Sequence, residues 1–464
     1  MTDIMDTERK SLSGAIRRLF SCESVTYEEM MALLMPLLLE NIITVGITLI
    51  NASMVSSSGM ETLSAVTLID TYVSMIIHMF QGVSTGAAII VAQYHGAKRS
   101  EQMRESAVSS ISIVTIFGLL LSLFSILFRG GIIRLFFGAA DPNVLSIASY
   151  YMLGNCLSLP FQAFAAAQLG SMRGVGEGRN ALIVVISNSV SYLIGNLIFL
   201  VILKMSVTGL ILSLGISRAF MAVACIVVKR ICPSHLVFHL KELLHPEFSY
   251  LKRIVKYGFP ISFENLLFDG GRMIIQMIIT PLGTDMIAGY NIAYNLMTFS
   301  QIPNNSITSA LFVGAGMCMG AGRPDDLKEW YKRIFKANTA IYILVDMIIL
   351  ALNGPIISFF HVPVQMPVRI LHCVMIIFAV EVTVHTAGFM TTTVLRAAGD
   401  VMMCTILSAV SMWVFRVIGA YVFGRVLGFG IEGVCIGMAM DWTFRAIVFT
   451  HRYRQNRWMG LHVI

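Results

Sequence analysis

The chain has 464 residues, of which 56% are hydrophobic and only 13% are charged, and it carries a formal net charge of +7. This composition leaves too little polar surface to cover a soluble protein of this length, so it excludes a soluble globular fold. The basic residues lie between apolar segments rather than along one stripe, which argues against nucleic-acid binding as the reason for the positive charge.

The apolar segments, taken in chain order, predict twelve membrane-spanning helices. A spanning helix needs roughly 20 apolar residues, and charge clusters together with Gly and Pro mark where each helix ends. The helices are expected near 28–53, 64–92, 105–128, 144–170, 181–203 and 207–228, and then near 254–280, 287–318, 335–353, 367–393, 402–424 and 428–450. The predicted fold is therefore an all-α membrane protein with two lobes of six helices.

The polar segments set the predicted domain limits. Residues 28–228 form the first lobe and residues 254–450 the second, and residues 229–253 link them. The leader, residues 1–27, lacks the short apolar run and cleavage site of a secretory signal, so we expect it to stay as a tail, like residues 451–464.

The distribution of Lys and Arg predicts the orientation. The tails and the even-numbered loops hold 24 of these residues, whereas the opposite side holds five. Because basic residues favour the cytoplasmic side, both termini and the linker are expected in the cytosol, with the protein in the cell membrane.

The eight cysteines show no paired spacing, and most of them lie inside apolar segments. Cysteine behaves there as a small hydrophobic residue. Neither a disulfide framework nor a resident metal site is predicted, and no cofactor is expected.

The second half of the chain repeats the first. Seven residues recur 224 positions later, and three more correspond at 223 positions. A repeat of six helices, an even number, starts each copy on the same side of the membrane, so a pseudo-two-fold axis along the membrane normal is expected, with the substrate site between the halves. The matched residues are Pro36, Glu40, Asn41, Gly46, Gly59, Gly96 and Ala97 with Pro260, Glu264, Asn265, Gly270, Gly283, Gly320 and Ala321, and Arg173, Gly176 and Glu177 with Arg396, Gly399 and Asp400.

Short motifs recur at the ends of the predicted helices. They are Gln93–Ala97, Gly320–Gly322, Arg173–Glu177, Arg396–Asp400, Gly258–Pro260 with Glu264–Asn265, and Ser411–Arg416. In this order and register, from about residue 30 to residue 455, they resemble the multidrug and toxic compound extrusion (MATE) transporters. The resemblance implies twelve helices in two lobes, a central cavity, and export of organic cations in exchange for sodium ions or protons.

The Arg173–Glu177 and Arg396–Asp400 turns are predicted to be structural rather than substrate contacts. Gly399 permits a left-handed turn there, and Asp400 is placed to cap the following helix. We therefore assign Arg173, Arg396 and Asp400 to the architecture.

Charged residues inside the predicted helices are the candidate site residues. A charge in the bilayer is energetically unfavourable, so each is expected to have a partner, a water-filled cavity or a function. Asp441 and Arg445 lie four apart, the spacing of an intrahelical ion pair, and are predicted to be structural. Arg272 could neutralise Asp269, whereas Glu264 has no basic residue three or four positions away, which makes it the expected main carboxylate. The embedded set is Glu40, Arg218, Glu264, Asp269, Arg272, Asp346, Glu381, Arg416, Asp441 and Arg445, with His78 and His385.

Further candidates lie on the first and tenth helices. Glu40 takes the place of Glu264 in the first repeat. The MATE resemblance implies a carboxylate for the coupling ion near Glu381 and His385, although these two residues could instead form a structural pair. Many MATE members carry an acid where Asn51 stands, so Asn51 is expected to contact substrate but not to carry a proton. A transient sodium ion could bind at Glu264 or Glu381.

These features predict a secondary antiporter that exports amphipathic organic cations. The chain has no zinc-protease, nucleophile-elbow or phosphate-loop motif, so an enzyme is not expected. A flippase for lipid-linked oligosaccharides is the alternative, although embedded acids outnumber embedded bases, which does not suit its anionic substrate. The expected partners are small organic cations and the lipid bilayer, without nucleic acid, and the expected state is a monomer.

Overall fold

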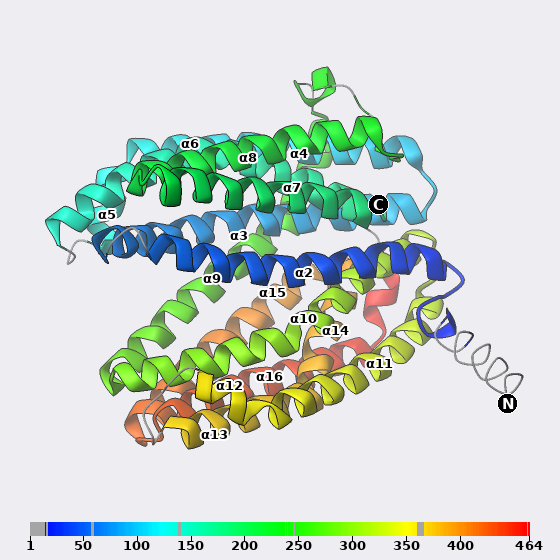
Figure 1. The fold of residues 1–464 in the computed structure, drawn as a ribbon. Coiled ribbons are helices and arrows are strands. Elements are labelled where there is room, and N and C mark those ends of the chain that lie inside the picture. The colour runs from blue at the N-terminus through cyan, green and yellow to red at the C-terminus, as the bar shows by residue number, and fades with distance from the viewer. Residues whose placement is uncertain are drawn as a thin grey trace, which may run out of the picture. The chain divides into compact units, whose positions relative to one another are not determined.

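The computed structural model describes residues 14, 17–56, 60–137, 141–236, 238, 240–244, 246–359, 366–461 and 463–464. Throughout these residues the regular structure is helical, which confirms the predicted all-α class (Figure 1). Gly59, one of the residues of the sequence repeat, lies outside the described part of the chain.

Six long helices make up the first half of the chain. Their bounds are α2 Tyr27–Ser56, α3 Met60–Gly96, α4 Ser100–Leu127, α6 Pro142–Gly174, α7 Gly178–Asn196 with its π-helical extension η1 Leu197–Ile202, and α8 Ser206–Ile231, with the short α5 Arg129–Phe137 and η2 Leu240–Leu244 between them or after them. They match the six helices predicted for this half. The short α5 was not predicted, because nine residues are too few to span a membrane.

Six long helical stretches also make up the second half. They are α9 Phe248–Ile279, α10 Thr284–Gly320, α11 Pro324–Ala351, α13 Met366–Val380 continued by η4 Glu381–His385 and α14 Thr386–Ala397, α15 Val401–Val410 continued by η5 Ser411–Val417 and η6 Ala420–Val426, and α16 Ile431–Arg454, with the short η3 Thr280–Leu282, α12 Asn353–Phe359 and η7 Arg457–Gly460. The predicted tenth and eleventh helices thus contain π-helical segments that the sequence pattern did not reveal.

The chain folds into two compact units. The N-unit comprises Met35–Asn265, and the C-unit comprises Leu266–Ile464 together with the chain up to Leu34. The division runs through α2 and α9, so the first turns of α2 pack with the C-unit and the first half of α9 packs with the N-unit. The lobe limits taken from the sequence follow whole helices instead, and as domain limits they remain a prediction.

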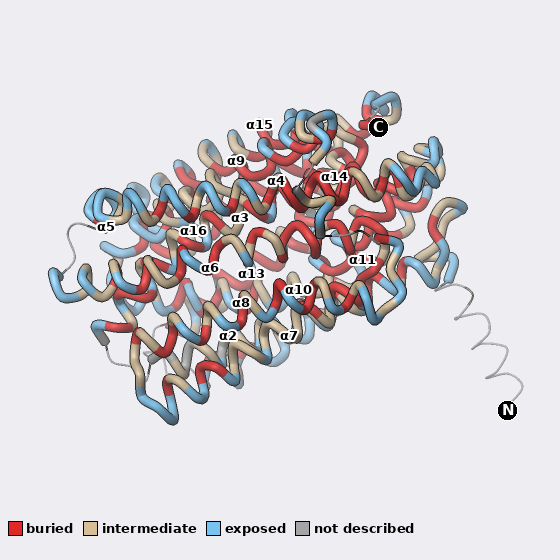
Figure 2. The backbone as a smooth tube through the Cα atoms, turned by 90° about the horizontal axis from the view of Figure 1, so that it is seen from above, coloured by how far each residue is buried: buried red, intermediate tan, exposed pale blue. Residues whose placement is uncertain are grey.

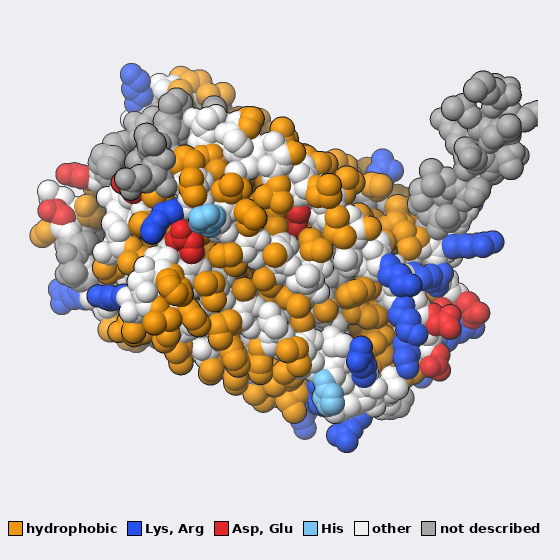
Figure 3. Space-filling model, turned by 90° about the horizontal axis from the view of Figure 1, so that it is seen from below, with side chains coloured by type: hydrophobic (Ala, Val, Ile, Leu, Met, Phe, Trp, Pro, Cys, Tyr) orange, Lys and Arg blue, Asp and Glu red, His pale blue; other side chains and the backbone are white. Residues whose placement is uncertain are grey.

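Ten helices are long and apolar enough to cross a membrane by length and composition. Of the twelve long helical stretches, α9 and α10 fall outside this set, since α9 carries several charges and α10 carries five amide side chains. Large apolar side chains are exposed along α4, among them Leu119, Leu123 and Leu127. Figure 3 shows hydrophobic side chains spread widely over the middle of the face that it draws, with most of the Lys and Arg side chains nearer its edges. Such a surface suits contact with lipid rather than with water.

Glycines allow α9 to approach α3 closely within the N-unit. A Cβ atom at Gly86 would collide with the backbone of Gly258, and one at Gly82 would collide with Ser262. The Ser262 hydroxyl donates to the carbonyl of Met79 at 2.7 Å, which ties the two helices together. Small residues with a hydroxyl bond at a crossing are typical of helix packing in membranes. Figure 2 shows buried positions recurring along the helices, as such packing requires.

The two repeated turns have the predicted backbone but different side-chain contacts. Gly176 and Gly399 have φ angles of +85° and +103°, in the left-handed region that favours glycine. The prediction that Asp400 caps the next helix is wrong. Its side chain makes no cap hydrogen bond to α15 and instead accepts two hydrogen bonds from Arg452 of α16, because a guanidinium offers two parallel donors to one carboxylate.

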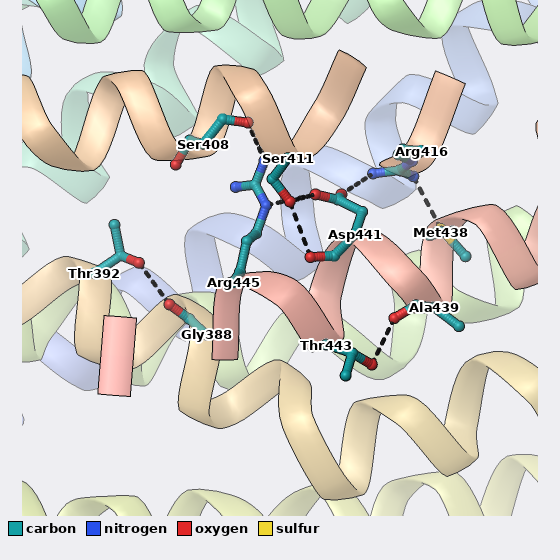
Figure 4. A network of polar contacts seen from close by, with 10 residues as sticks. All are labelled: Gly388, Thr392, Ser408, Ser411, Arg416, Met438, Ala439, Asp441, Thr443 and Arg445. Carbon is teal, nitrogen blue, oxygen red and sulfur yellow. Dashed lines mark hydrogen bonds and ion pairs between the residues drawn. The ribbon is translucent and has the colours of Figure 1, made fainter. Parts of the chain in front are cut away.

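Asp441 lies at the centre of a buried cluster in the C-unit (Figure 4). Arg445 Nε donates to Asp441 Oδ1 at 2.8 Å, as the four-residue spacing predicted, and the Ser411 hydroxyl donates to the same oxygen. Arg416 Nη1 lies 3.7 Å from Asp441 Oδ2, so two guanidinium groups neutralise one carboxylate. The cluster joins α15, η5 and α16, which is a structural task.

The glycine crossing predicts a stability change. Replacing Gly86 with Ala places a methyl group against the Gly258 backbone and should lower the free energy of unfolding by about 1–3 kcal/mol, as overpacking does. Thermal unfolding of the purified protein in detergent would measure it. Gly215→Ala is the matched control, because a Cβ atom there meets nothing within 4 Å. Equal melting temperatures for the two variants would contradict the crossing.

Disrupting the Asp441 cluster should lower the free energy of unfolding by more than the Gly86 substitution does. Among the described residues, Asp441 is the carboxylate that pairs with both Arg416 and Arg445, so Asp441→Asn should lower the free energy of unfolding by about 3–5 kcal/mol, as for other broken buried ion pairs. The same unfolding assay applies. Asp285→Asn changes an exposed acid at the start of α10 and should leave the melting temperature nearly unchanged. A small effect of Asp441→Asn would show that the cluster is not structural.

Candidate functional site

A buried polar group lies within the C-unit where α10, α11 and η4 meet. Gln301 Nε2 of α10 donates to Glu381 Oε1 at 2.7 Å, and the Ser300 hydroxyl donates to Asp346 Oδ1 of α11. The two acids are close enough to interact electrostatically. Glu381 and Asp346 are both buried. One pair of adjacent α10 side chains therefore binds both acids.

Each of these acids keeps one oxygen open. Glu381 Oε2 and Asp346 Oδ2 are buried and have no hydrogen-bond partner within the described residues. A buried carboxylate oxygen without a hydrogen-bond donor raises the free energy of the folded protein unless a proton or a cation binds to it. Two such oxygens in one region of the C-unit form an arrangement that can take up a small cation or a proton.

The backbone at Glu381 is also unusual. Glu381–His385 is a π-helical turn between α13 and α14, and π-helical turns inside α-helices occur frequently at functional sites. The wider turn changes the direction in which Glu381 and His385 point, which the predicted 3.6-residue period did not take into account.

His385 has partners of its own. Its Nδ1 lies 3.1 Å from the Tyr342 hydroxyl, and its ring stacks on Phe389 with centroids 4.1 Å apart and meets Trp442 edge-on at 4.6 Å. The contacts described for these two side chains are therefore with other residues, and they do not include the structural histidine–glutamate pair considered from the sequence. His385 lies in an aromatic setting, and Glu381 faces the amide of Gln301.

Asp346 was among the embedded charges found in the sequence, but no role was predicted for it. It is the one acid in the apolar run 341–350, and that isolation was the signal available. Only the fold shows that α11 brings it near Glu381, because 35 residues separate the two along the chain.

A second polar group lies in the N-unit. Asp70 of α3 is exposed, and its Oδ1 accepts a hydrogen bond from the Tyr151 hydroxyl of α6 at 2.9 Å. Arg218 of α8 is buried, and its Nη1 donates to Asn155 Oδ1 at 2.6 Å and to the Ser158 hydroxyl at 2.8 Å. An exposed carboxylate ten residues inside a membrane-spanning helix is expected to face water rather than lipid. The sequence analysis missed Asp70.

Asn51 belongs to the N-unit as well. Its Oδ1 accepts a hydrogen bond from Asn196 Nδ2 at 3.0 Å. Asn196 is the last residue of α7, directly before the π-helical η1. Polar residues thus lie beside a π-helical segment in both units.

Glu40 forms an ion pair with Arg173 inside the N-unit, with 2.5 Å between Oε1 and Nη2. The structure thereby joins a predicted coupling residue to a predicted turn residue, which gives Glu40 an architectural contact. In the sequence repeat, Glu40 corresponds to Glu264 and Arg173 to Arg396.

Glu264 is buried on α9 within the N-unit. The next residue, Asn265, donates to the carbonyl of His78 at 2.9 Å, so this turn of α9 is fixed against α3. Asp269 lies farther along α9, and its Oδ1 is 3.9 Å from Nη1 of Arg272, as their spacing predicted. Glu264 and Asp269 therefore belong to different compact units.

Comparisons with known proteins agree with this organisation. The MatE family model matches residues 36–198 and again residues 260–422, with starts and ends each 224 residues apart. This confirms the repeat found in the sequence. The chain is 23% identical over 416 residues to "Uncharacterized transporter YisQ" of Bacillus subtilis, covering 88% of this chain and 89% of that protein. It is 23% identical over 449 residues to "Probable multidrug resistance protein NorM" of Thermotoga maritima, covering 93% of each.

Solved structures share the fold. One described as the outward-facing conformation of a multidrug resistance MATE family transporter superposes with a TM-score of 0.85 at 20% identity, covering 97% of this chain and 99% of that one. Another is described as a transporter of the MOP superfamily from Pyrococcus furiosus with reverse polarity of its binding pocket, and it has a TM-score of 0.84 at 20% identity, covering 95% and 97%. Because the family model matches most of the chain in two successive copies, the protein belongs to the MatE family and is a multi-span membrane transporter rather than an enzyme.

Proposed function

We propose that this transporter is a secondary active antiporter that exports amphipathic organic cations in exchange for sodium ions or protons by alternating access. The observation that carries the proposal is the pair of buried acids in the C-unit, Glu381 and Asp346, each with one open oxygen. The names of relatives such as the Thermotoga maritima protein agree with multidrug export.

The coupling would reside mainly at Glu381 and Asp346. A carboxylate held in a medium of low dielectric constant gains much from binding a proton or a sodium ion, and that binding removes its attraction for a cationic substrate. Ion entry and substrate release would thus be linked by competition for the same negative charge. Gln301 and Ser300 would orient the two carboxylates for this exchange.

Glu264 was the main coupling carboxylate expected from the sequence, whereas this proposal assigns that role to Glu381 and Asp346. Its counterpart in the repeat, Glu40, is held in an ion pair by Arg173, which supports an architectural task for this position of the repeat. Glu381 has the open oxygen and the π-helical turn.

The N-unit would contribute to substrate binding through Asp70, Tyr151 and Asn51. The exposed Asp70 carboxylate, oriented by the hydroxyl of the buried Tyr151, offers a negative charge to an organic cation. Asn51 cannot carry a proton, so proton coupling at this position is not part of the proposal. The embedded acids do not favour the flippase alternative.

The remaining parts of the proposal concern placement. Both termini would lie in the cytosol and the protein in the plasma membrane, since 24 basic residues fall on one side and five on the other. One chain carries both copies of the repeat, so a monomer would suffice for transport, with no cofactor besides the coupling ion.

The main test concerns coupling at the C-unit. Glu381→Gln keeps the shape and the bond to Gln301 but removes the charge, so it should lower gradient-driven efflux about tenfold or more, as expected for the loss of a charged interaction. Asp346→Asn should act in the same direction. Efflux of a fluorescent lipophilic cation from proteoliposomes, with the sodium and pH gradients set independently, measures it.

Controls for this test are available in the chain. Asp285→Asn, an exposed acid at the start of α10, should keep wild-type coupling. Glu264→Gln should reduce efflux less than Glu381→Gln. If Glu264→Gln abolished coupling while Glu381→Gln retained it, the ion site would lie on α9 and the present assignment would fail.

A separate test concerns substrate recognition by the N-unit. Asp70→Asn should weaken equilibrium binding of the same cation to the purified protein by about tenfold, because the carboxylate supplies charge that the amide lacks. Tyr151→Phe, which removes only the hydroxyl bonded to Asp70, should have a smaller effect. Unchanged affinity for Asp70→Asn together with lost ion dependence would assign Asp70 to coupling instead of binding.

A further inference from the structure

Two cysteines and an aspartate from three separate segments meet in the C-unit. Cys22 lies in the segment before α2, Cys318 in the last turn of α10 and Asp326 in the first turn of α11. Their ligand atoms all lie within 4.8 Å of one another, and the two sulfur atoms are 3.6 Å apart. Cys318 is buried, whereas Cys22 and Asp326 are half-buried.

The sulfur spacing fits two thiolates on one metal ion. With a Zn–S bond of about 2.3 Å, tetrahedral geometry places two sulfurs roughly 3.7 Å apart. A disulfide would need the same atoms at about 2.05 Å. Two thiolates and a carboxylate are a ligand set suited to zinc, which is four-coordinate in most protein sites.

The carboxylate is oriented by neighbouring donors. Asp326 Oδ2 accepts hydrogen bonds from the Ser24 amide at 3.1 Å and from its hydroxyl at 3.0 Å. Metal-binding carboxylates commonly have such partners, which fix their direction. The segment is also held by the ion pair between Glu23 Oε2 and Arg323 Nη1 at 2.7 Å. The three ligands therefore meet where other contacts already hold the segment before α2 in place.

We propose that Cys22, Cys318 and Asp326 bind one thiophilic divalent cation of the zinc class, with water as the fourth ligand. Both thiols lose their protons to solvent when the ion binds. The bound ion fastens the segment before α2 to the turn between α10 and α11. The sequence analysis predicted no metal site because Cys22 and Cys318 are 296 residues apart, which leaves no spacing motif to find.

The test uses the full-length protein in detergent with a phosphine reductant present. Zinc titration against a chromophoric chelator should give one tight site per chain, and cobalt in its place should give the charge-transfer absorption of a thiolate complex. Zinc should also protect Cys22 of the wild-type protein from alkylation, a readout that needs no variant.

The variants separate the ligands from the rest of the chain. Cys22→Ser and Asp326→Asn should each weaken zinc binding by more than about 100-fold, since loss of even an outer partner costs 10–100-fold. Asp326→Asn keeps an acceptor oxygen for Ser24 and loses only the long contact from the Glu23 amide at 3.4 Å, so the segment stays docked. Cys232→Ser is the matched control, because Cys232 is also a half-buried cysteine but lies outside the cluster.

Three results would overturn the proposal. They are a wild-type protein without a tight zinc site, a Cys22→Ser variant with wild-type affinity, and a Cys22–Cys318 disulfide found by peptide mapping of the protein before any reductant is added. Without metal, wild type and Asp326→Asn should have similar melting temperatures. Weaker zinc binding by the variant would then reflect the lost ligand and not a damaged fold.

Discussion

The constraint on which the structure depends is that lipid offers no hydrogen bonds. Every backbone donor and acceptor in a spanning segment must be satisfied within the protein, and a helix satisfies them locally. This explains why the regular structure in the described residues is all helical and why apolar side chains such as Leu123 of α4 are exposed on the protein surface. It also makes every charged side chain in a helix an exception that needs a reason.

Several of these charges are neutralised by ion pairs. Asp441 meets Arg445 and Arg416, and Glu40 meets Arg173. In each case oppositely charged side chains from different helices, or from successive turns, cancel one another and fix the packing. Such pairs do not leave a negative charge free to exchange an ion.

Glu381 and Asp346 differ from these pairs because they accept hydrogen bonds from neutral side chains. Gln301 and Ser300 orient the acids without neutralising them, and one oxygen of each acid stays open. The π-helical turn at Glu381 interrupts the regular helix at the same place. A site that accepts and releases an ion needs carboxylates that no fixed basic side chain neutralises. Glu381 and Asp346 meet this requirement.

The sequence by itself determined the class of structure. Apolar segments predicted twelve helices because a bilayer has a fixed thickness, although α9 and α10 are less apolar than the other ten. The repeat predicted two copies, which the two family matches confirm. The ion pair of Asp441 and Arg445 could be predicted because helix geometry alone brings residues four apart together.

Only the tertiary structure decided which distant side chains meet. Glu381 with Asp346, Asp70 with Tyr151, and Cys22 with Cys318 come from different helices or segments, and no periodic pattern encodes such neighbours. The same reason explains the error at Asp400, whose position at a helix start suggested a cap, while the packing of α16 brought Arg452 close enough to bind it instead. Local patterns determine each helix, because its bonds are local, whereas the site depends on contacts that exist only once the helices are packed.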